Sequence, residues 1–172
     1  MKVGVIIARF QVAELHDGHK YLIRKVIEKC EHLIILLGCK KEPDEKNILS
    51  FAVRSGMLEE WIETSFPGLS WRVLPIHDHR EDNAMWSYNV DDAIVDGALG
   101  RVEEVMLYGS RDSFHSYYTG RFPYEEIPPL EGYSGTEERN KYTENCNDVD
   151  FRKGIVHGFN LYRKYLIDNQ QK

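Results

Sequence analysis

Apolar residues gather along the chain in blocks of two kinds. Residues 3–8 (VGVIIA) and 33–38 (LIILLG) are continuous apolar runs rich in Val, Ile and Leu, as expected of strands covered on both faces in a parallel sheet. Between them, residues 18–30 place apolar side chains at a helical spacing. Because two parallel strands need a long crossover between them, these blocks predict a strand, helix, strand unit.

The same alternation continues toward the C-terminus. After a polar loop at 39–50, Ser50 is a candidate N-cap for the next helix. Further helices are predicted at 51–64, 84–98, 111–118, from 135 and at 148–168, and further strands at 71–76, 104–109 and 122–127. Repeated strands and helices joined by short connections predict an α/β fold with a five-stranded, doubly wound parallel sheet, helices on both faces and a C-terminal helix. The chain shows no repeat and no linker, so residues 1–172 are expected to form a single domain.

Composition and charge exclude several classes of protein. With 42% apolar and 29% charged residues, the chain has the make-up of a globular protein and not of a disordered one. Its net charge of -6 argues against general nucleic-acid binding, although a small anionic ligand could still be held locally. The 3 cysteines match no disulfide or CxxC pattern, and neither a membrane-spanning run nor a leader is visible. We therefore expect a cytoplasmic protein that contacts neither membranes nor nucleic acid.

The segment at residues 8–23 (ARFQVAELHDGHKYLI) joins the first predicted strand to the first predicted helix. Doubly wound sheets bind their ligands at this end of the strands. His16 and His19 enter the helix three residues apart, so their imidazoles lie on one side and can donate together to one anionic group. A helix N-terminus also attracts phosphate, and Gly18 lets a ligand approach the backbone. Taken alone, the HxGH string fits a plain helix cap equally well.

A second segment, YSGTEERNKY at residues 133–142, also combines a helix start with polar donors. Ser134 and Glu137 form an SxxE capping box, which by itself indicates only a helix cap. Arg139 follows one turn into the helix, beside hydroxyl and backbone NH groups that could cradle a triphosphate. The usual phosphate-binding sequences, GxxxxGK(S/T) and GxGxxG, are missing, so nucleotide binding must use another arrangement.

Taken together, HxGH after a strand and SGTxxR at a later helix start resemble the nucleotidyltransferase superfamily that carries HxGH and (S/T)xxR motifs. Within it, the chain is most similar to nicotinamide mononucleotide (NMN) adenylyltransferases of the archaeal type. The resemblance rests on ARFQ and HDGH, on LPIHDHREDNAMW at 74–86, on LYGSRD at 107–112 and on YSGTEER at 133–139. The chain departs from the family at Ala8, where the family has Gly, and at VAEL, which replaces Pro-Phe and lengthens the loop before His16. Some relatives carry a second, hydrolase domain, which this chain is expected to lack.

The resemblance implies an enzyme that joins the 5'-phosphate of NMN to the α-phosphorus of ATP, forming NAD and pyrophosphate, with Mg2+ bridging phosphate oxygens. Its implied catalytic residues are His16, His19 and Arg139. The implied ATP contacts are Arg9, Phe10, Gln11, Gly18, Gly109, Ser110, Ser134 and Thr136. The implied contacts to NMN are Asn83, Trp86 and Arg54, with the Trp86 indole stacked on the nicotinamide ring.

Several of these residues also have a plainer interpretation. Trp86 fits a core aromatic and Arg54 a surface arginine on a helix. The turn from His77 to His79 lacks a convincing third metal ligand, so we expect no metal site there. The apolar spacing at residues 151–166 indicates packing on the sheet or on a neighbouring subunit, which leaves a homo-oligomer open. Alternative functions are adenylyl or cytidylyl transfer to another phosphorylated acceptor such as phosphopantetheine, and nucleotide sensing without turnover.

Overall fold

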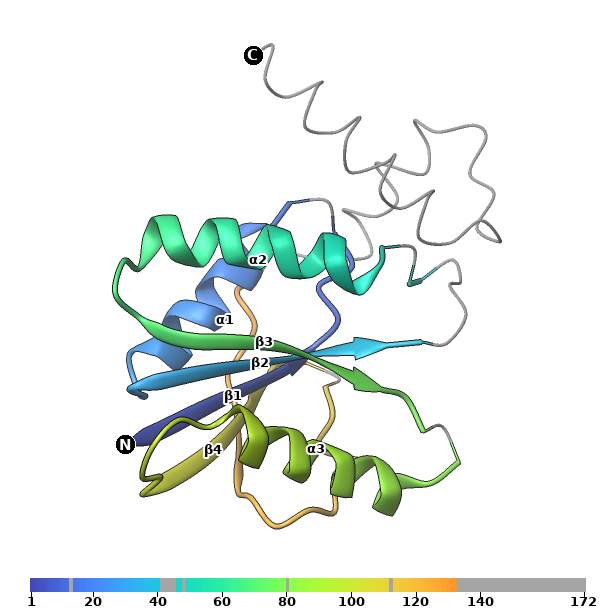
Figure 1. Ribbon diagram of the computed structural model, residues 1–172. Helices are drawn as coiled ribbons and strands as arrows, with labels where there is room; N and C mark the ends of the chain where they lie inside the picture. Colours follow the sequence, from blue (N-terminus) through green and yellow to red (C-terminus); the bar gives the residue numbers. More distant parts are fainter. Residues whose placement is uncertain (13, 41–45, 48, 80, 112, 133–172) are drawn as a thin grey trace.

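The computed structural model describes residues 1–12, 14–40, 46–47, 49–79, 81–111 and 113–132. They contain β1 (Lys2–Ala8), α1 (Asp17–Ile27), β2 (His32–Cys39), α2 (Phe51–Ser65), β3 (Ser70–His77), α3 (Asn83–Gly97), β4 (Glu104–Gly109) and β5 (Tyr124–Glu126). These strands form one 5-stranded sheet in the order β3-β2-β1-β4-β5, and every neighbouring pair is parallel. The predicted doubly wound parallel sheet is therefore confirmed (Figure 1).

The sheet reverses its winding between β1 and β4. The chain runs outward from β1 through β2 to β3, then crosses back along α3 and adds β4 and β5 on the other side. Helices α1 and α2 lie on one face of the sheet and α3 on the other (Figure 1). Successive side chains of a strand point to opposite faces, so Ile6 packs in the core with α1 and α2 while Val5 packs in the core with α3. The carboxyl ends of β1 and β4 meet at this switch point, where doubly wound folds bind ligands.

The prediction of a short helix at 111–118 is wrong. The described residues there form turns, in which the NH of Tyr118 donates to the carbonyl of Phe114 at 3.0 Å. The next NH group, that of Thr119, donates instead to the Oγ of Ser87 on α3 at 2.9 Å. A tertiary contact thus replaces the hydrogen bond that would continue a helix.

The other elements predicted up to residue 127 are present, with ends that shift by a few residues. The helices predicted from 135 and at 148–168 lie outside the described residues. Among the helices that the structure describes, none has the length and apolar character needed to cross a membrane.

His32 begins β2 and is fully buried. Its Nδ1 lies 2.7 Å from the hydroxyl of Ser70 at the start of β3, and its Nε2 lies 3.2 Å from the carbonyl oxygen of Gly97 at the end of α3. Because a carbonyl can only accept, the ring proton is on Nε2 and the Ser70 hydroxyl donates to Nδ1. Burial lowers the pKa of His32 from its ordinary value, and the hydrogen bond to Gly97 opposes that shift.

The free energy of unfolding is expected to fall as the pH is lowered through the titration range of His32. The pKa of His32 is lower in the folded protein than in the unfolded chain, where it is about 6.5. Below that pH the unfolded chain binds more protons, so stability decreases by at most about 1.4 kcal/mol per pH unit until the folded pKa is passed. Urea denaturation at a series of pH values measures this slope. His32→Gln should flatten it, and an unchanged slope in that variant would assign the effect to other groups.

Candidate active site

The connection between β1 and α1 carries the two histidines of the HxGH string. His16 is the N-cap of α1, with an extended backbone (φ -76°, ψ 166°), and its Nδ1 accepts the backbone NH of His19 at 3.4 Å. The two imidazole rings stack, with centroids 3.7 Å apart and planes 22° from parallel. The structure thus places His16 and His19 side by side at a helix N-terminus beyond the carboxyl end of β1, with Gly18 between them in the first turn.

Phe10 supports this pair from the core. Its side chain is 3% exposed, and its ring meets that of His19 edge to face with centroids 4.8 Å apart. Its φ of 46° lies in the left-handed region, which costs a residue with a side chain roughly 1–2 kcal/mol. This unfavourable backbone angle turns the chain out of β1 and lets the aromatic ring point inward beneath His19.

Gln11 ties the same loop to the segment before α2. The side chain of Gln11 is buried, and its amide pairs with the backbone of Leu49 at two points. The NH of Leu49 donates to Oε1 at 2.8 Å, and Nε2 donates to the carbonyl of Leu49 at 3.2 Å. Both polar ends of this side chain are therefore engaged inside the protein, where they fix the position of the loop that carries Phe10.

Arg9 lies across the carboxyl ends of the strands. Its Nη1 donates to Asn47 Oδ1 at 2.7 Å, and its Nη2 forms a 2.7 Å ion pair with Asp78 Oδ2 just after β3. The Arg9 side chain is 41% exposed and that of Asp78 is 18% exposed, so the cation is held by protein groups on one side and is open to solvent on the other. It therefore remains accessible to an anionic ligand.

Arg54 on α2 is buried beneath this loop, with 2% of its surface exposed. Its Nη1 donates to the carbonyl of Arg9 at 2.6 Å and to that of Gly38 at 3.1 Å, and its Nε donates to the carbonyl of Ser50 at 3.2 Å. Its Nη2 lies 3.5 Å from the Sγ of Cys39. Burial lowers the pKa of Arg54, and the neighbouring Cys39 opposes this shift. The guanidinium predicted to contact NMN is thus directed at backbone carbonyls of the loops around it.

At the end of β4 the side chain of Ser113 lies close to the backbone of Gly109. A Cβ at Gly109 would lie 2.1 Å from the Oγ of Ser113, so only glycine fits there without rearrangement. The carbonyl of Gly109 accepts the NH of Ile127 at 2.8 Å, and that of Ser110 accepts the NH of Ser113 at 3.1 Å. Gly109 at the end of β4 and Ser110 after it, both predicted ATP contacts, therefore lie next to the carboxyl end of β1.

The start of α3 carries the two residues predicted to contact nicotinamide. Asp82 is the N-cap, and its carboxylate accepts the NH of Met85 at 2.8 Å. Asn83 is exposed in the first turn. Trp86 is half-buried: it packs against the core under α3, and its indole lies perpendicular to the ring of Tyr118 with centroids 6.4 Å apart. Trp86 is therefore both a partial core residue and accessible from outside.

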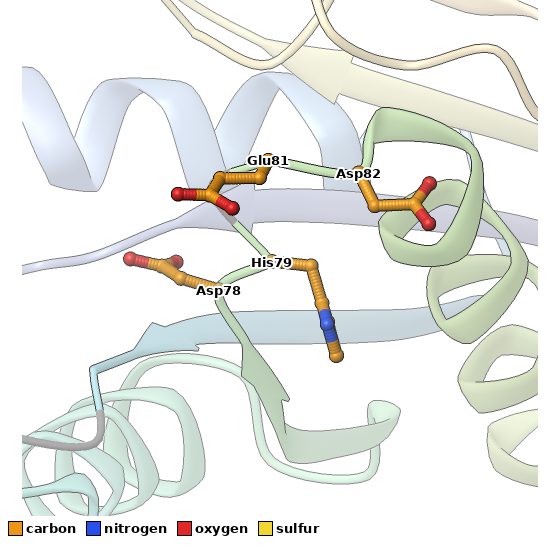
Figure 2. A pocket seen from close by; sticks show the side chains of 4 residues that line it. All are labelled: Asp78, His79, Glu81 and Asp82. Atoms are coloured by element: carbon orange, nitrogen blue, oxygen red, sulfur yellow. The ribbon is translucent and has the colours of Figure 1, made fainter.

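A cavity of about 330 Å³ opens beside the start of α3 and is lined by Asp78, His79, Glu81 and Asp82. Figure 2 shows the carboxylates of Asp78 and Glu81 turned to one side and that of Asp82 turned toward α3. His79 Nε2 lies 3.0 Å from Asn89 Nδ2. In the part of the chain that the structure describes, no group of three or more His, Cys, Asp or Glu side chains is placed to hold a metal ion.

Sequence reasoning missed the residues that hold the two arginines in place. Asp78 follows β3, and the carboxyl ends of parallel strands meet at one edge of a sheet. The polar turn after the third predicted strand was therefore a usable signal for a partner of Arg9. No sequence pattern pointed to the backbone carbonyls around Arg54. Ser134, Thr136 and Arg139, predicted to hold the triphosphate, lie outside the described residues.

The sheet order and the helices on both faces define a Rossmann-like α/β fold. No protein-family model matches the chain. Among solved structures, it is similar to a bifunctional NMN adenylyltransferase/ADP ribose pyrophosphatase from Francisella tularensis. The TM-score is 0.74 and the identity 20%, over 99% of this chain and 54% of that chain. A structure of this bifunctional protein in complex with AMP and a manganese ion gives a TM-score of 0.65 and 18% identity, over 99% of this chain and 53% of that chain.

The chain is also similar to the NadR protein in complex with NAD and AMP-PNP. That TM-score is 0.58 and the identity 15%, over 84% of this chain and 42% of that chain. The chain thus spans about half the length of the structures that it matches. At these identities the likeness shows a shared fold.

Proposed function

We propose that the protein transfers the adenylyl group of ATP to NMN, forming NAD and pyrophosphate. The observation that carries this proposal is the stacked His16 and His19 pair at a helix N-terminus beside the switch point. The similar structures described as NMN adenylyltransferases support the choice of reaction, and the one with AMP and a manganese ion supports the use of a divalent metal. Mg2+ would supply positive charge to the ATP phosphates while taking few protein ligands, because this ion keeps several waters.

The proposed reaction requires little acid or base catalysis by the protein. The attacking phosphate monoester has a second pKa of about 6, so it is mostly dianionic at neutral pH and needs no general base. Its oxygen forms a bond to the α-phosphorus while the bond to the β-phosphate oxygen breaks and pyrophosphate leaves. Catalysis then consists of aligning the two phosphates and stabilising the negative charge in the transition state.

The contacts of His16 support Nε2 as its donor nitrogen in this proposal. Its Nδ1 accepts the backbone NH of His19, so in the neutral ring the proton is on Nε2. His16 Nε2 and the His19 ring would then donate to phosphate oxygens of ATP. Arg9 would add positive charge from the exposed side of its guanidinium. Arg139, Ser134 and Thr136 are proposed to bind the β- and γ-phosphates, and Phe10, Gln11, Gly18, Gly109 and Ser110 to shape the ATP site.

A direct assay tests the function. The purified chain is incubated with ATP, Mg2+ and NMN, and both NAD and pyrophosphate are quantified. Equal amounts of the two products are expected. Parallel reactions with nicotinate mononucleotide and phosphopantetheine, and one with CTP and choline phosphate, define the acceptor and the nucleotide. Pyrophosphate release with one of the other acceptors but not with NMN would replace the proposed substrate. Nucleotide binding without pyrophosphate release would indicate a sensor.

Trp86→Ala is expected to weaken NMN binding selectively. In the proposal the indole stacks on the cationic pyridinium ring, an interaction of about 0.5–2 kcal/mol, which corresponds to a roughly 2- to 30-fold rise in the apparent KM for NMN. The apparent KM for ATP should change little. Steady-state kinetics with each substrate varied in turn measures both constants. A larger rise for ATP than for NMN would reject this role of Trp86.

A further inference from the structure

One stripe of α3 is polar, and its second and third residues face the protein. Asn83, Ser87 and Asp91 are spaced four residues apart, which places them on the same side of the helix. Ser87 is 2% exposed and the side chain of Asp91 is 15% exposed. Buried polar groups require partners, and on this stripe the partners come from residues 118–122, the segment between β4 and β5.

Two side chains of α3 accept hydrogen bonds from backbone NH groups of this segment. The Oγ of Ser87 accepts the NH of Thr119 at 2.9 Å and donates to the carbonyl of Asn83 at 2.6 Å. The carboxylate of Asp91 accepts the NH of Arg121 at 3.0 Å. The 118–122 segment is therefore fixed to the helix that carries both residues assigned to nicotinamide.

Tyr118 is the best anchored residue of the segment. Its hydroxyl donates to the Asp91 carboxylate and accepts the NH of Phe122 at 3.1 Å. Burial and the Asp91 carboxylate raise the pKa of Tyr118, so the hydroxyl remains a proton donor at neutral pH. A Cβ at Gly120 would lie 2.5 Å from the Tyr118 ring and hydroxyl, so the glycine leaves the room in which the ring sits.

The anchored ring lies edge to face with the indole of Trp86. The two ring planes are 89° apart with centroids at 6.4 Å, an edge-to-face arrangement that favours one orientation of the indole. Trp86 is only half-buried, so without this neighbour its side chain would have more freedom to rotate. We propose that Tyr118 is a positioning residue for the acceptor, holding the Trp86 indole in the orientation in which it stacks on nicotinamide. This inference rests on the proposed function.

Kinetics of three variants tests the inference. Tyr118→Leu removes the ring, and Gly120→Ala displaces it. Both should raise the apparent KM for NMN roughly 3- to 10-fold, within the range set by the loss of a stacked cation, while the apparent KM for ATP changes less than about twofold. Tyr118→Phe retains the ring but loses both hydrogen bonds of the hydroxyl, so its KM for NMN should lie between those of the wild type and Tyr118→Leu. Unchanged KM values in both Tyr118→Leu and Gly120→Ala would overturn the inference.

Phe114→Leu is the matched control. Phe114 is also buried and packs perpendicular to Tyr118 with centroids 6.0 Å apart, but it has no described ring contact with Trp86. Its replacement should lower thermal stability without shifting the ratio of the two KM values. If it raises the KM for NMN as much as Tyr118→Leu does, the effect is general loosening of the core and the proposal fails.

Fluorescence separates this inference from the proposed function. The chain has 3 tryptophans, so Trp61→Phe and Trp71→Phe leave Trp86 as the single reporter. NMN should quench its emission in this background, and adding Tyr118→Leu should shift the quenching midpoint to higher NMN concentration. If the background protein forms no NAD and NMN does not quench it, the proposed function fails. If it responds and Tyr118→Leu does not shift the midpoint, only the role of Tyr118 fails.

Discussion

His16→Ala is expected to lower kcat for NAD formation by about 10²-fold or more, the cost of removing one donor that acts mainly on transition-state charge. The apparent KM values should change much less, because such a donor contributes little to ground-state binding. The Nε2 of His16 is the group removed, since Nδ1 already accepts the NH of His19. Steady-state assay of NAD and pyrophosphate measures the effect.

His16→Asn separates the catalytic role from helix capping. Asn is among the most favourable N-cap residues, so its side-chain oxygen can replace Nδ1 as acceptor for the NH of His19 while the Nε2 donor is lost. Its thermal unfolding should stay close to that of the wild type, whereas its kcat should fall almost as far as that of His16→Ala. Turnover equal to the wild type in either variant would remove His16 from the proposed mechanism.

The success of the fold prediction has a specific physical cause. A strand covered on both faces has no polar face, so the runs at 3–8 and 33–38 contain no polar side chain. In the structure Ile34, Ile35, Leu36 and Leu37 are all fully buried. Short connections between strands and helices then restrict the possible sheet topologies, because crossovers between parallel strands are almost always right-handed. The 111–118 segment escaped this reasoning because the hydrogen bond that would continue its turns into a helix is replaced by one from Thr119 to Ser87 on α3, a contact that local spacing does not encode.

In the candidate site, too, local geometry could be predicted from the sequence and long-range contacts could not. The adjacency of His16 and His19 follows from helix geometry within four residues, and the sequence predicts it. The partners of Arg9 come from Asn47 and Asp78, which lie 38 and 69 residues away in the chain. Which of many polar residues meets a given arginine depends on the three-dimensional path of each loop. Residue type alone therefore indicated cations near phosphate but could not tell an exposed guanidinium from a buried one.

Arg54→Met provides the sharpest test of that distinction. Met keeps most of the apolar stem but removes the donors to the carbonyls of Arg9, Gly38 and Ser50. Leaving buried acceptors without donors costs about 1–3 kcal/mol per group, so we expect the free energy of unfolding to fall by roughly 2–4 kcal/mol once partial relaxation is allowed for. Urea denaturation at neutral pH measures this change. Activity should fall as well, because the carbonyl of Arg9 belongs to the loop that leads to the histidines.

Arg72→Met is the matched control for this substitution. Arg72 is exposed on β3 and makes one long hydrogen bond, 3.5 Å to the carbonyl of Asp96, so its replacement should change stability by less than about 0.5 kcal/mol. If the main partner of Arg54 were instead a substrate phosphate, Arg54→Met would be as stable as Arg72→Met. Its defect would then be confined to the apparent KM for NMN. A stability loss that is present without any substrate instead assigns Arg54 to the support of the site, with Arg9 as the cation that faces outward.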